Sequence, residues 1–324
     1  MSGRLVVLDA SYGDITVEAA SAARYGVTVE DAGGVSGARV VDAASSADGV
    51  LVQYGTIGAD IIERCPAWRV IGRYGVGVDN VDVAAATSRG IAVINVPDYC
   101  VEEVATHAAA LVLAGTRKLA RSRELIDAGR WGDWRELGPV QPLSACVLGL
   151  VGVGRIGGEV IRLLGPFFGR VVAHDPARTP PPGVEAVGLD ELFTCSDVVS
   201  LHCPLTPETR ALVDAPRLAS MKSSSFLVNV SRGGLVDTDA LAQALRAGRI
   251  AGAGLDVLPQ EPPHADDPLL GAPNLLLTNH SAWYSEAALT ACRRLLAERC
   301  SAYLNGEPAA TVVNARELAA AVAR

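Results

Sequence analysis

Short apolar runs alternate with segments of helical periodicity over the first hundred positions. Runs of Val, Ile and Leu without polar alternation are typical of strands buried on both faces of a parallel sheet. We expect such strands at Leu5–Leu8, Val50–Val52, Val70–Ile71 and Ala92–Ile94. Helical patterns lie between them at Ile57–Cys65 and Val81–Arg89. Strands that alternate with helices predict βαβ units with right-handed crossovers.

A long helix and a polar segment interrupt this alternation. The apolar spacing predicts a helix over roughly Val101–Thr116. The next segment, Lys118–Gly138, contains several arginines with Trp131 and Trp134, and it has little core periodicity. It is either an arm that makes an oligomer contact or a solvated surface hairpin of helices.

A second and clearer alternation begins at Cys146. Its expected strands are Cys146–Val151, Val171–His174, Val198–Leu201, Phe226–Val230, Ala253–Val257 and Leu275–Leu277. The stretch Pro180–Gly183 predicts a rigid surface loop, and Ser285–Leu304 reads as one long helix. Because 324 residues exceed the usual size of a single core, the chain is predicted to be an α/β protein of two domains.

Composition and charge narrow the class of protein. Hydrophobic residues make up 49% and charged residues 20% of the chain, as in ordinary globular proteins. There is no apolar run long enough to span a bilayer, and the N-terminus enters a strand-like run without a cleavable leader pattern, so we expect a cytoplasmic protein without a membrane anchor. The net charge of −8 argues against binding to nucleic acid, which calls for a basic face.

The seven cysteines are widely scattered and form no Cys-x-x-Cys pair. An odd, dispersed set of this kind fits reduced thiols rather than a disulfide framework. The five histidines are likewise dispersed, without a cluster of metal-ligand spacing. We therefore expect no metal site.

A glycine-rich turn follows the first strand of the second alternation. The strand Cys146–Val151 runs directly into Gly152-Val153-Gly154-Arg155-Ile156-Gly157, and a helix follows. In a dinucleotide-binding turn the first glycine allows the tight turn, the second lets the backbone approach the pyrophosphate, and the third lets helix and strand pack closely. Amides at the helix N-terminus then face an anion. The alternative is a glycine-rich turn that serves packing alone.

An acidic residue ends the next strand. Asp175 lies at about the 20-residue spacing at which an acid binds the adenosine ribose 2′-hydroxyl and repels a 2′-phosphate. This position favours NAD over NADP. Arg178 lies close by, and an arginine there is a feature that accommodates a 2′-phosphate.

Three further strand ends carry polar residues suited to the reduction of a 2-oxo acid. That reaction needs a cation for the carboxylate and carbonyl, an acid that protonates the developing alkoxide, and a group that keeps this acid protonated. Arg232, Glu261 and His280 follow three successive strands. Ligands of doubly wound folds bind at the carboxyl ends of strands, so the three side chains are expected to converge. Taken singly, each has the alternative of a surface charge, a loop residue or a structural histidine.

Several motifs in order resemble one known family. Arg73–Asn80, Gly152–Gly157, Asn229–Asp237 and Asn279–Ser285 look like the corresponding segments of the D-isomer-specific 2-hydroxyacid dehydrogenases, and the similarity covers nearly the whole chain. The run His280–Glu286 most resembles the branch that contains the C-terminal-binding proteins, the NAD-linked corepressors.

The resemblance implies a role for each candidate residue. Arg232 would bind and polarise the substrate, His280 would act as acid and base, and Glu261 would pair with His280 and raise the pKa of its imidazole. Contacts to NAD would come from Val76, Thr106, Gly152, Val153, Gly154, Arg155, Ile156, Gly157, Asp175, Cys203, Pro204, Thr209, Val230, Ser231, Arg232, Asp256 and His280. Contacts to the substrate would come from Tyr54, Gly75, Val76, Gly77, Arg232, His280 and Trp283.

Among these implied contacts, Asp256 would meet the nicotinamide carboxamide, Thr106 would reach the phosphates, and backbone amides around Val76 and Gly77 would hold the substrate carboxylate. The resemblance also implies two doubly wound lobes, with a Rossmann NAD-binding domain inserted into a flavodoxin-like substrate domain. Residues 1–98 and 286–324 would form the substrate domain and residues 99–285 the NAD-binding domain. A hinge between the lobes would close on the ligand, and the protein would be a homodimer.

Two departures from the family pattern bear on the substrate. Asn279 stands where a proline usually precedes the catalytic histidine, which alters local stiffness but leaves the imidazole. The loop Gln53-Tyr54-Gly55 lacks the basic residues of members that act on phosphorylated substrates, so a phosphoglycerate-type substrate is disfavoured. Tyr54, Tyr99 and Trp283 either line a pocket for a larger or apolar side chain or pack where the lobes meet.

The expected function is therefore that of an enzyme, an NAD-dependent dehydrogenase that transfers a hydride between NAD(H) and a small 2-oxo or 2-hydroxy acid, with D-stereochemistry implied by the family. The alternative is an NAD(H)-sensing or corepressor-like scaffold that retains the fold. Within the enzymes, oxidation of an unusual anion such as phosphite is a narrower alternative.

Overall fold

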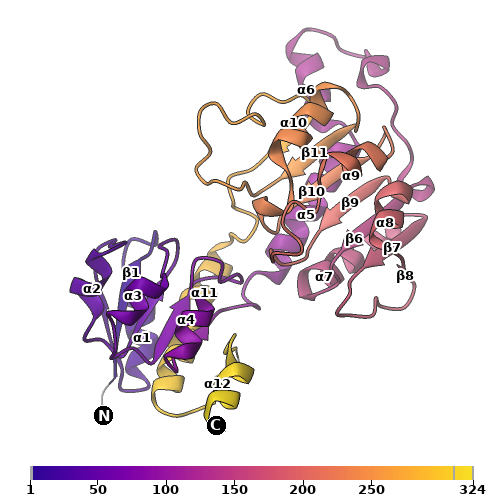
Figure 1. Cartoon of the computed structure of the whole chain (residues 1–324). Helices are drawn as coiled ribbons and strands as arrows, with labels where there is room; N and C mark the ends of the chain where they lie inside the picture. The colour runs from indigo at the N-terminus through magenta and orange to yellow at the C-terminus, as the bar shows by residue number, and fades with distance from the viewer. Residues whose placement is uncertain (1–2, 309–310, 323–324) are drawn as a thin grey trace. The chain divides into compact units, whose positions relative to one another are not determined.

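The chain folds into two compact units, each built around its own parallel sheet (Figure 1). The computed structural model describes residues 3–308 and 311–322. Unit 1 comprises Met1–Cys100 and Ser285–Arg324, and unit 2 comprises Val101–Tyr284. One unit is thus inserted into the other along the chain.

The sheet of unit 1 has five parallel strands in the order β2-β1-β3-β4-β5. These are β1 (Arg4–Asp9), β2 (Thr28–Asp31), β3 (Gly49–Val52), β4 (Val70–Arg73) and β5 (Ala92–Ile94). This is the strand order of flavodoxin-like folds, as expected from the resemblance. The four strands predicted from apolar runs are confirmed. Strand β2 was not predicted, because it lies at the sheet edge, is largely exposed and has no apolar run.

Helices cover both faces of this sheet. On one face lie α1 (Thr16–Ala23) and α11 (Glu286–Leu304), and on the other lie α2 (Arg39–Ala44), α3 (Ala59–Glu63) and α4 (Val83–Ser88). Along β1, Leu5 and Val7 pack into the first layer and Val6 and Leu8 into the second. The strand is apolar throughout because both of its faces are buried.

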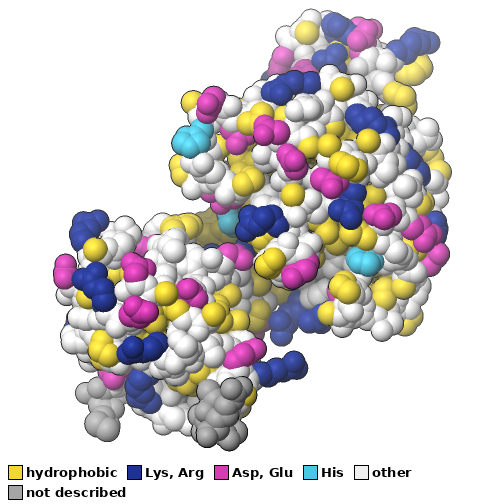
Figure 2. Space-filling model, viewed as in Figure 1, with side chains coloured by type: hydrophobic (Ala, Val, Ile, Leu, Met, Phe, Trp, Pro, Cys, Tyr) yellow, Lys and Arg dark blue, Asp and Glu magenta, His cyan; other side chains and the backbone are white. Residues whose placement is uncertain are grey.

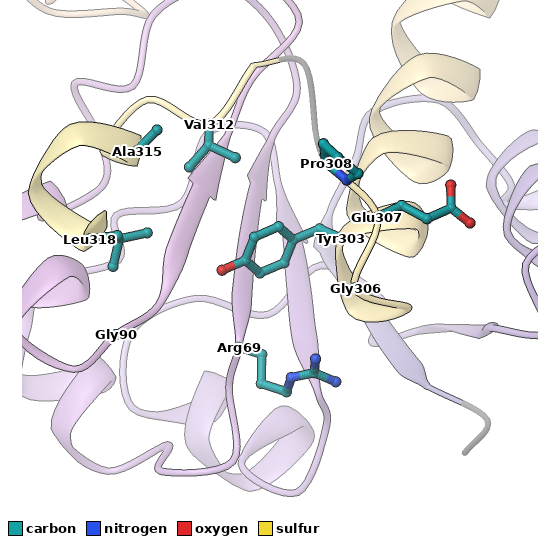
Figure 3. A pocket seen from close by; sticks show the side chains of 9 residues that line it. All are labelled: Arg69, Gly90, Tyr303, Gly306, Glu307, Pro308, Val312, Ala315 and Leu318. Atoms are coloured by element: carbon teal, nitrogen blue, oxygen red, sulfur yellow. The ribbon is translucent and has the colours of Figure 1, made fainter. Parts of the chain in front are cut away.

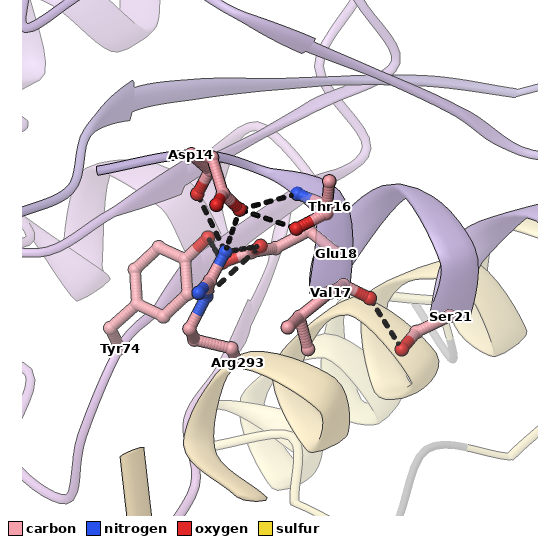
Figure 4. Close-up of polar contacts among 7 residues, drawn as sticks. All are labelled: Asp14, Thr16, Val17, Glu18, Ser21, Tyr74 and Arg293. Carbon is pink, nitrogen blue, oxygen red and sulfur yellow. Dashed lines mark hydrogen bonds and ion pairs between the residues drawn. The ribbon is translucent and has the colours of Figure 1, made fainter. Parts of the chain in front are cut away.

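A buried ion pair joins α11 to α1 within unit 1. Arg293 donates to both carboxylate oxygens of Glu18, and the hydroxyl of Tyr74 donates to the same carboxylate from the end of β4 (Figure 4). The guanidinium also donates to the backbone carbonyl of Asp14. The last long helix of the chain is thereby tied to the first helix.

A hollow of about 540 Å³ opens beside the C-terminal helix α12 (Ala315–Val322). Tyr303 and Leu318 face into it from α11 and α12, with Arg69 at its rim (Figure 3). Arg69 and Gly90 precede β4 and β5, so the hollow lies at the amino ends of the strands. Ligands of doubly wound sheets bind at the opposite, carboxyl edge.

The sheet of unit 2 has seven parallel strands in the order β12-β11-β10-β9-β6-β7-β8. These are β6 (Val147–Val151), β7 (Arg170–His174), β8 (Glu185–Ala186), β9 (Val198–Leu201), β10 (Phe226–Asn229), β11 (Gly252–Leu255) and β12 (Leu275–Leu277). The direction of winding reverses between β6 and β9, as in a Rossmann fold. All six predicted strands are confirmed, and the two-residue edge strand β8 was not predicted.

Five helices cover the two faces of the second sheet. The helices α5 (Val101–Thr116) and α7 (Arg155–Leu164) pack against one another, and α5 contacts β10 and β11. The opposite face carries α8 (Leu189–Cys195), α9 (Ala215–Ser220) and α10 (Thr238–Arg246) over the main apolar core. The bounds of α5 agree with the prediction. Short 3₁₀ turns occur at η2 (Leu143–Ala145), η3 (Gly165–Phe167) and η4 (Gly233–Leu235).

The polar segment after α5 forms helix α6 (Leu119–Asp127) and the short 3₁₀ turn η1 (Trp134–Leu137). Within α6 and η1, Leu125 is the one buried residue. Trp131 is 84% exposed and Trp134 65% exposed, and the guanidinium of Arg135 lies over the Trp134 ring. The interpretation as an oligomer arm stays a prediction.

Surface charge and cysteine chemistry agree with the composition. Basic and acidic side chains are mixed within each unit on the face shown in Figure 2. All seven cysteines are free thiols, as the sequence predicted, and most of them are buried. Over residues 3–308 and 311–322, no helix combines the length and the apolar character needed to cross a membrane, and no cluster of metal-ligating side chains is found.

Candidate active site

The glycine turn after β6 has the geometry that a dinucleotide requires. Gly152 has a φ of +94°, and a β-carbon there would lie 2.8 Å from the backbone carbonyl of His202. A β-carbon on Gly157 would lie 2.2 Å from the carbonyl oxygen of Gly152, so helix α7 packs directly on the turn. A β-carbon on Gly154 would meet nothing within 4 Å. The middle glycine thus leaves open the side from which a pyrophosphate approaches.

The N-terminus of α7 and the end of β7 complete this turn. Arg155 begins the helix and is exposed, with Ile156 half-buried behind it. Asp175 follows β7 directly and is half-buried; its carboxylate accepts hydrogen bonds from the amides of Val153, at 2.9 Å, and Ala177. The acid therefore lies beside the glycine turn, where the sequence predicted it. These residues fit an adenine dinucleotide: amides of a helix N-terminus for the phosphates and a carboxylate for the ribose.

The loop after β9 lies under and beside the glycine turn. His202 is partly buried, its Nε2 lies 2.8 Å from the hydroxyl of Ser200, and its buried Nδ1 has no hydrogen-bond partner among the described residues. Burial lowers the pKa of His202 to about 4. Next, Cys203 and Pro204 lead into a turn that the Thr209 hydroxyl closes by donating to the carbonyl of Pro204. Burial raises the pKa of the Cys203 thiol to about 11.

Arg232 is held by the turn that follows β10. Asn229, the last residue of the strand, is fully buried, and its side chain donates to the carbonyl of Arg232 and accepts from the amide of Ser231. The hydroxyl of Ser231 donates to the carbonyl of Leu201 on β9. Val230 is buried. The backbone that presents Arg232 is thus anchored on two neighbouring strands.

Glu261 and His280 form a direct hydrogen-bonded pair. The Nδ1 atom of His280 lies 2.5 Å from Oε2 of Glu261, and the amide of Leu258 donates to Oε1 at 2.8 Å. Burial pushes the pKa of Glu261 upward, yet the hydrogen bonds and charge of His280, the Leu258 amide and the charge of Arg232 outweigh it, so this pKa lies below its ordinary value. Because an ionised carboxylate only accepts hydrogen bonds, Nδ1 carries a proton.

Close backbone packing brings the Arg232 turn to the Glu261 loop. A β-carbon on Gly233 would lie 1.9 Å from the carbonyl carbon of Leu258, so only glycine allows the two loops to touch. Glu261 lies three residues beyond that contact, and His280 is bonded to it. The structure therefore brings together the three residues that the sequence predicted to converge, all at the carboxyl ends of strands in unit 2.

Asp256 has more partners than the sequence suggested. It is 2% exposed, and its carboxylate accepts from the hydroxyl of Thr278 and from the amides of Ser281 and Ala282. The predicted contact with the nicotinamide carboxamide stays a prediction. In the chain itself, this acid holds the loop that carries His280.

The remaining predicted site residues lie in both units. In unit 1, Tyr54 is 64% exposed, Gly75 has a φ of +116°, and the side chain of Asn95 donates to the carbonyl of Val76. Gly77 follows and is partly exposed. In unit 2, Thr106 lies on the exposed side of α5, and its hydroxyl donates to carbonyls one turn earlier in the helix.

The two aromatic side chains that were grouped with Tyr54 have local packing partners. Trp283 stacks edge-on against Tyr284 in unit 2. Tyr99 packs at the edge of the core of unit 1. A role for these three aromatic residues in a substrate pocket stays a prediction.

Some residues that shape the site were not recognised in the sequence. Asn229, Thr278 and His107 are buried or half-buried polar side chains that bond to the site's loops. The available signal was a polar residue inside an apolar pattern: Asn229 ends a buried strand, and His107 interrupts the apolar face of α5.

Comparisons with known proteins agree with this geometry. Residues 109–282 match the family model described as "D-isomer specific 2-hydroxyacid dehydrogenase, NAD binding domain". A glyoxylate reductase of Korarchaeum cryptofilum is 40% identical over 267 residues, which cover 80% of this chain and 80% of the relative. A D-3-phosphoglycerate dehydrogenase of Methanocaldococcus jannaschii is 38% identical over 293 residues, which cover 88% of this chain but span only 55% of that relative's length.

A solved structure shares the arrangement as well as the sequence pattern. The D-lactate dehydrogenase of Aquifex aeolicus, complexed with NAD and lactic acid, is 26% identical with a TM-score of 0.84, and the match covers 94% of this chain and 96% of that one. The family match spans more than half of the 324 residues. The chain thus belongs to the D-isomer-specific 2-hydroxyacid dehydrogenase family of NAD-dependent oxidoreductases.

Proposed function

We propose that this chain reduces a small, unphosphorylated 2-oxo acid to the D-2-hydroxy acid at the expense of NADH. The observation that carries the proposal is the Glu261–His280 pair, which lies beside the Arg232 turn in the same unit as the glycine turn. An acid–base group, its orienting carboxylate and a guanidinium are the parts that carbonyl reduction needs.

The pair determines which nitrogen of His280 exchanges protons with the substrate. Glu261 accepts from Nδ1, so Nδ1 stays protonated and Nε2 is the atom that gives a proton to the developing alkoxide. The imidazole is neutral once that proton has left. In the reverse direction Nε2 takes the proton of the hydroxyl. The carboxylate fixes the orientation of the ring and does not take the proton itself.

Arg232 supplies the positive charge at the reacting centre. A guanidinium binds a carboxylate through two parallel hydrogen bonds, and it polarises a neighbouring carbonyl at no cost in protonation, because it stays charged. The anchoring of its backbone through Asn229 and Ser231 presets its position. Charge that develops on the carbonyl oxygen therefore meets a preorganised cation.

Bound NADH would supply the hydride. The amides of the Gly152–Gly157 turn would hold its pyrophosphate and Asp175 the adenosine ribose, which favours NADH over NADPH. The remaining predicted contacts, from Thr106, the Cys203–Thr209 loop and Val230–Ser231, belong to the same proposal.

The substrate class rests on the 53–55 loop of unit 1. The amides of Gln53, Tyr54 and Gly55 all donate to the carboxylate of Asp9, and the loop offers no basic side chain. A phosphorylated substrate would find no cation there. The family resemblance adds the amides of Val76 and Gly77 as donors to the substrate carboxylate.

A homodimer completes the proposal. The segment from α6 to η1 carries four exposed apolar side chains, Leu119, Ile126, Trp131 and Trp134. Exposed apolar surface of this kind is typical of protein–protein contacts. Seven free thiols support a reducing, cytoplasmic compartment.

A panel assay tests this function. Purified protein with NADH is offered glyoxylate, pyruvate and branched, aromatic and methylthio-bearing 2-oxo acids, and loss of nicotinamide absorbance is followed. We expect turnover that His280→Ala abolishes and Glu261→Gln reduces, with a D-configured product on a chiral column. Tight NADH binding without turnover of any 2-oxo acid would instead support an NAD(H)-sensing scaffold.

A further inference from the structure

A row of hydrogen bonds runs from helix α5 to the loop that carries His280. The Nε2 atom of His107 lies 3.0 Å from the hydroxyl of Thr278, and this hydroxyl donates to Oδ1 of Asp256 at 2.5 Å. The imidazole also lies 3.7 Å from the same carboxylate oxygen. Neither His107 nor Thr278 takes part in the proposed proton transfer or substrate binding.

The direction of these hydrogen bonds follows from the donors available. A carboxylate only accepts, so the single proton of the Thr278 hydroxyl points to Asp256. The hydroxyl oxygen must then accept from Nε2–H of His107. The hydroxyl also lies 3.5 Å from the carbonyl oxygen of Leu255, but its bond to Asp256 is much the shorter. The row therefore runs in one direction, from imidazole to hydroxyl to carboxylate.

Asp256 connects this row of hydrogen bonds to the loop that carries His280. Its carboxylate accepts from the amides of Ser281, at 3.0 Å, and Ala282, at 2.9 Å, and its carbonyl accepts from the amide of His280, at 2.8 Å. His280 has a φ of +56°, a left-handed conformation that residues with a side chain seldom adopt unless their surroundings hold them there. The bonds to Asp256 hold the peptide groups on both sides of His280.

We propose that His107 is a positioning residue for His280, acting through Thr278 and Asp256. The acid–base histidine is then fixed from two directions: Glu261 orients its ring, and the row from α5 fixes its backbone. This inference rests on the proposed function, because it presumes that His280 exchanges protons with the substrate.

Two pairs of variants separate a positioning role from simple packing. His107→Phe keeps a ring but removes the donor, whereas His107→Gln keeps an amide donor at the position of Nε2. Thr278→Val removes the hydroxyl at constant shape, and Thr278→Ser restores it. A displacement of about 1 Å at a reacting group can cost about 100-fold in rate. We expect kcat to fall at least about tenfold in His107→Phe and Thr278→Val, with recovery in the Gln and Ser variants.

Three readouts would not follow from a general loss of structure. The Kd for NADH should stay within about twofold of the wild-type value. The double variant His107→Phe/Thr278→Val should be no slower than the worse single variant, because both break one row. Thr116→Val, which removes a hydroxyl on the same helix that bonds only within α5, should keep wild-type kcat.

Hydrogen exchange tests the anchoring without reference to activity. In His107→Phe and Thr278→Val, the amides of Ser281 and Ala282 should exchange at least about tenfold faster than in the wild type, with the Tm little changed. Unchanged exchange at these two amides overturns the inference, as does wild-type kcat in His107→Phe. If the wild-type protein turned over no 2-oxo acid, the proposed function would fail, and the exchange rates would still decide whether His107 anchors the loop.

Discussion

Arg293 and Glu18 form a two-point ion pair inside unit 1: Nε lies 2.9 Å from Oε1 and Nη2 lies 2.7 Å from Oε2 (Figure 4). Glu18 is fully buried and Arg293 nearly so. The two residues are 275 positions apart, so the pair ties the returning C-terminal helix to the first helix of the chain. The hydrogen bonds that Arg293 donates to Glu18, together with the attraction of that charge, raise the pKa of Arg293 above its ordinary value despite the opposing effect of burial.

Breaking this pair on one side should destabilise unit 1 strongly. Arg293→Leu leaves the Glu18 carboxylate buried and uncompensated, a change that costs about 3–5 kcal/mol in comparable pairs. Urea unfolding of the variant checks the loss. Glu18→Leu/Arg293→Leu removes both charges and should recover a large part of it. A double variant less stable than Arg293→Leu alone would contradict the explanation by unpaired charge.

Unit 2 should become less stable as the pH falls, because unfolding allows His202 to take up a proton. Its pKa is about 4 in the folded protein, against an ordinary value of 6.5, because burial disfavours the charged ring. Between these values the unfolded state binds more protons than the folded state, so stability is full above pH 6.5 and falls as the pH drops toward 4. The shift corresponds to about 3 kcal/mol.

His202→Gln is the matched variant for this effect. It keeps an amide near the Ser200 hydroxyl but has no group that titrates in this range. Unfolding free energies measured from pH 7 to pH 4 should show a shallower decline in the variant than in the wild type. Parallel curves for the two proteins would mean that other groups cause the acid sensitivity.

Asp175 should set the preference between NADH and NADPH. Asp175→Asn keeps an oxygen that can accept from the Val153 amide but removes the negative charge that repels a 2′-phosphate. The ratio of kcat/KM for NADH to that for NADPH should fall by about tenfold, equivalent to about 1.4 kcal/mol. Asp190→Asn, an exposed substitution in the same unit, is the control. An unchanged ratio in Asp175→Asn would show that another residue selects the cofactor.

Arg232→Lys should lose most of the activity although the charge is retained. An ammonium cannot make the paired contacts of a planar guanidinium, so we expect kcat/KM to fall by about 100-fold, the loss typical of removing one donor to a developing charge. Arg294→Lys, a half-exposed substitution on α11, should be near wild type. Near-normal kinetics in Arg232→Lys would exclude this residue as the substrate anchor.

Much of the fold could be predicted because buried parallel strands are apolar on both faces. Each predicted strand in both sheets is present, and so is the helix over Val101–Thr116. The strands that escaped prediction, β2 and β8, are short edge strands with exposed residues, and they have no apolar run to mark them. The glycine spacing of Gly152–Gly157 was equally informative, because it reflects local backbone and packing requirements.

Sequence patterns predicted the residues of the candidate site but not how these residues contact one another. Arg232, Glu261 and His280 could be singled out because each follows a strand, and parallel strands present their carboxyl ends at one edge. Their contacts were not predictable in detail. The approach of Gly233 to Leu258 and the αL backbone of His280 depend on how separate loops pack.

The sequence alone determined two α/β units, a dinucleotide turn and three chemically matched residues at strand ends, since periodicity and motif spacing report on local backbone and burial. The tertiary structure alone decided which polar side chains meet: Glu18 with Arg293, and His107 with Thr278 across 171 positions. Such pairs form because crossovers bring distant helices and loops together. Local patterns along the chain therefore do not indicate which distant side chains will pair.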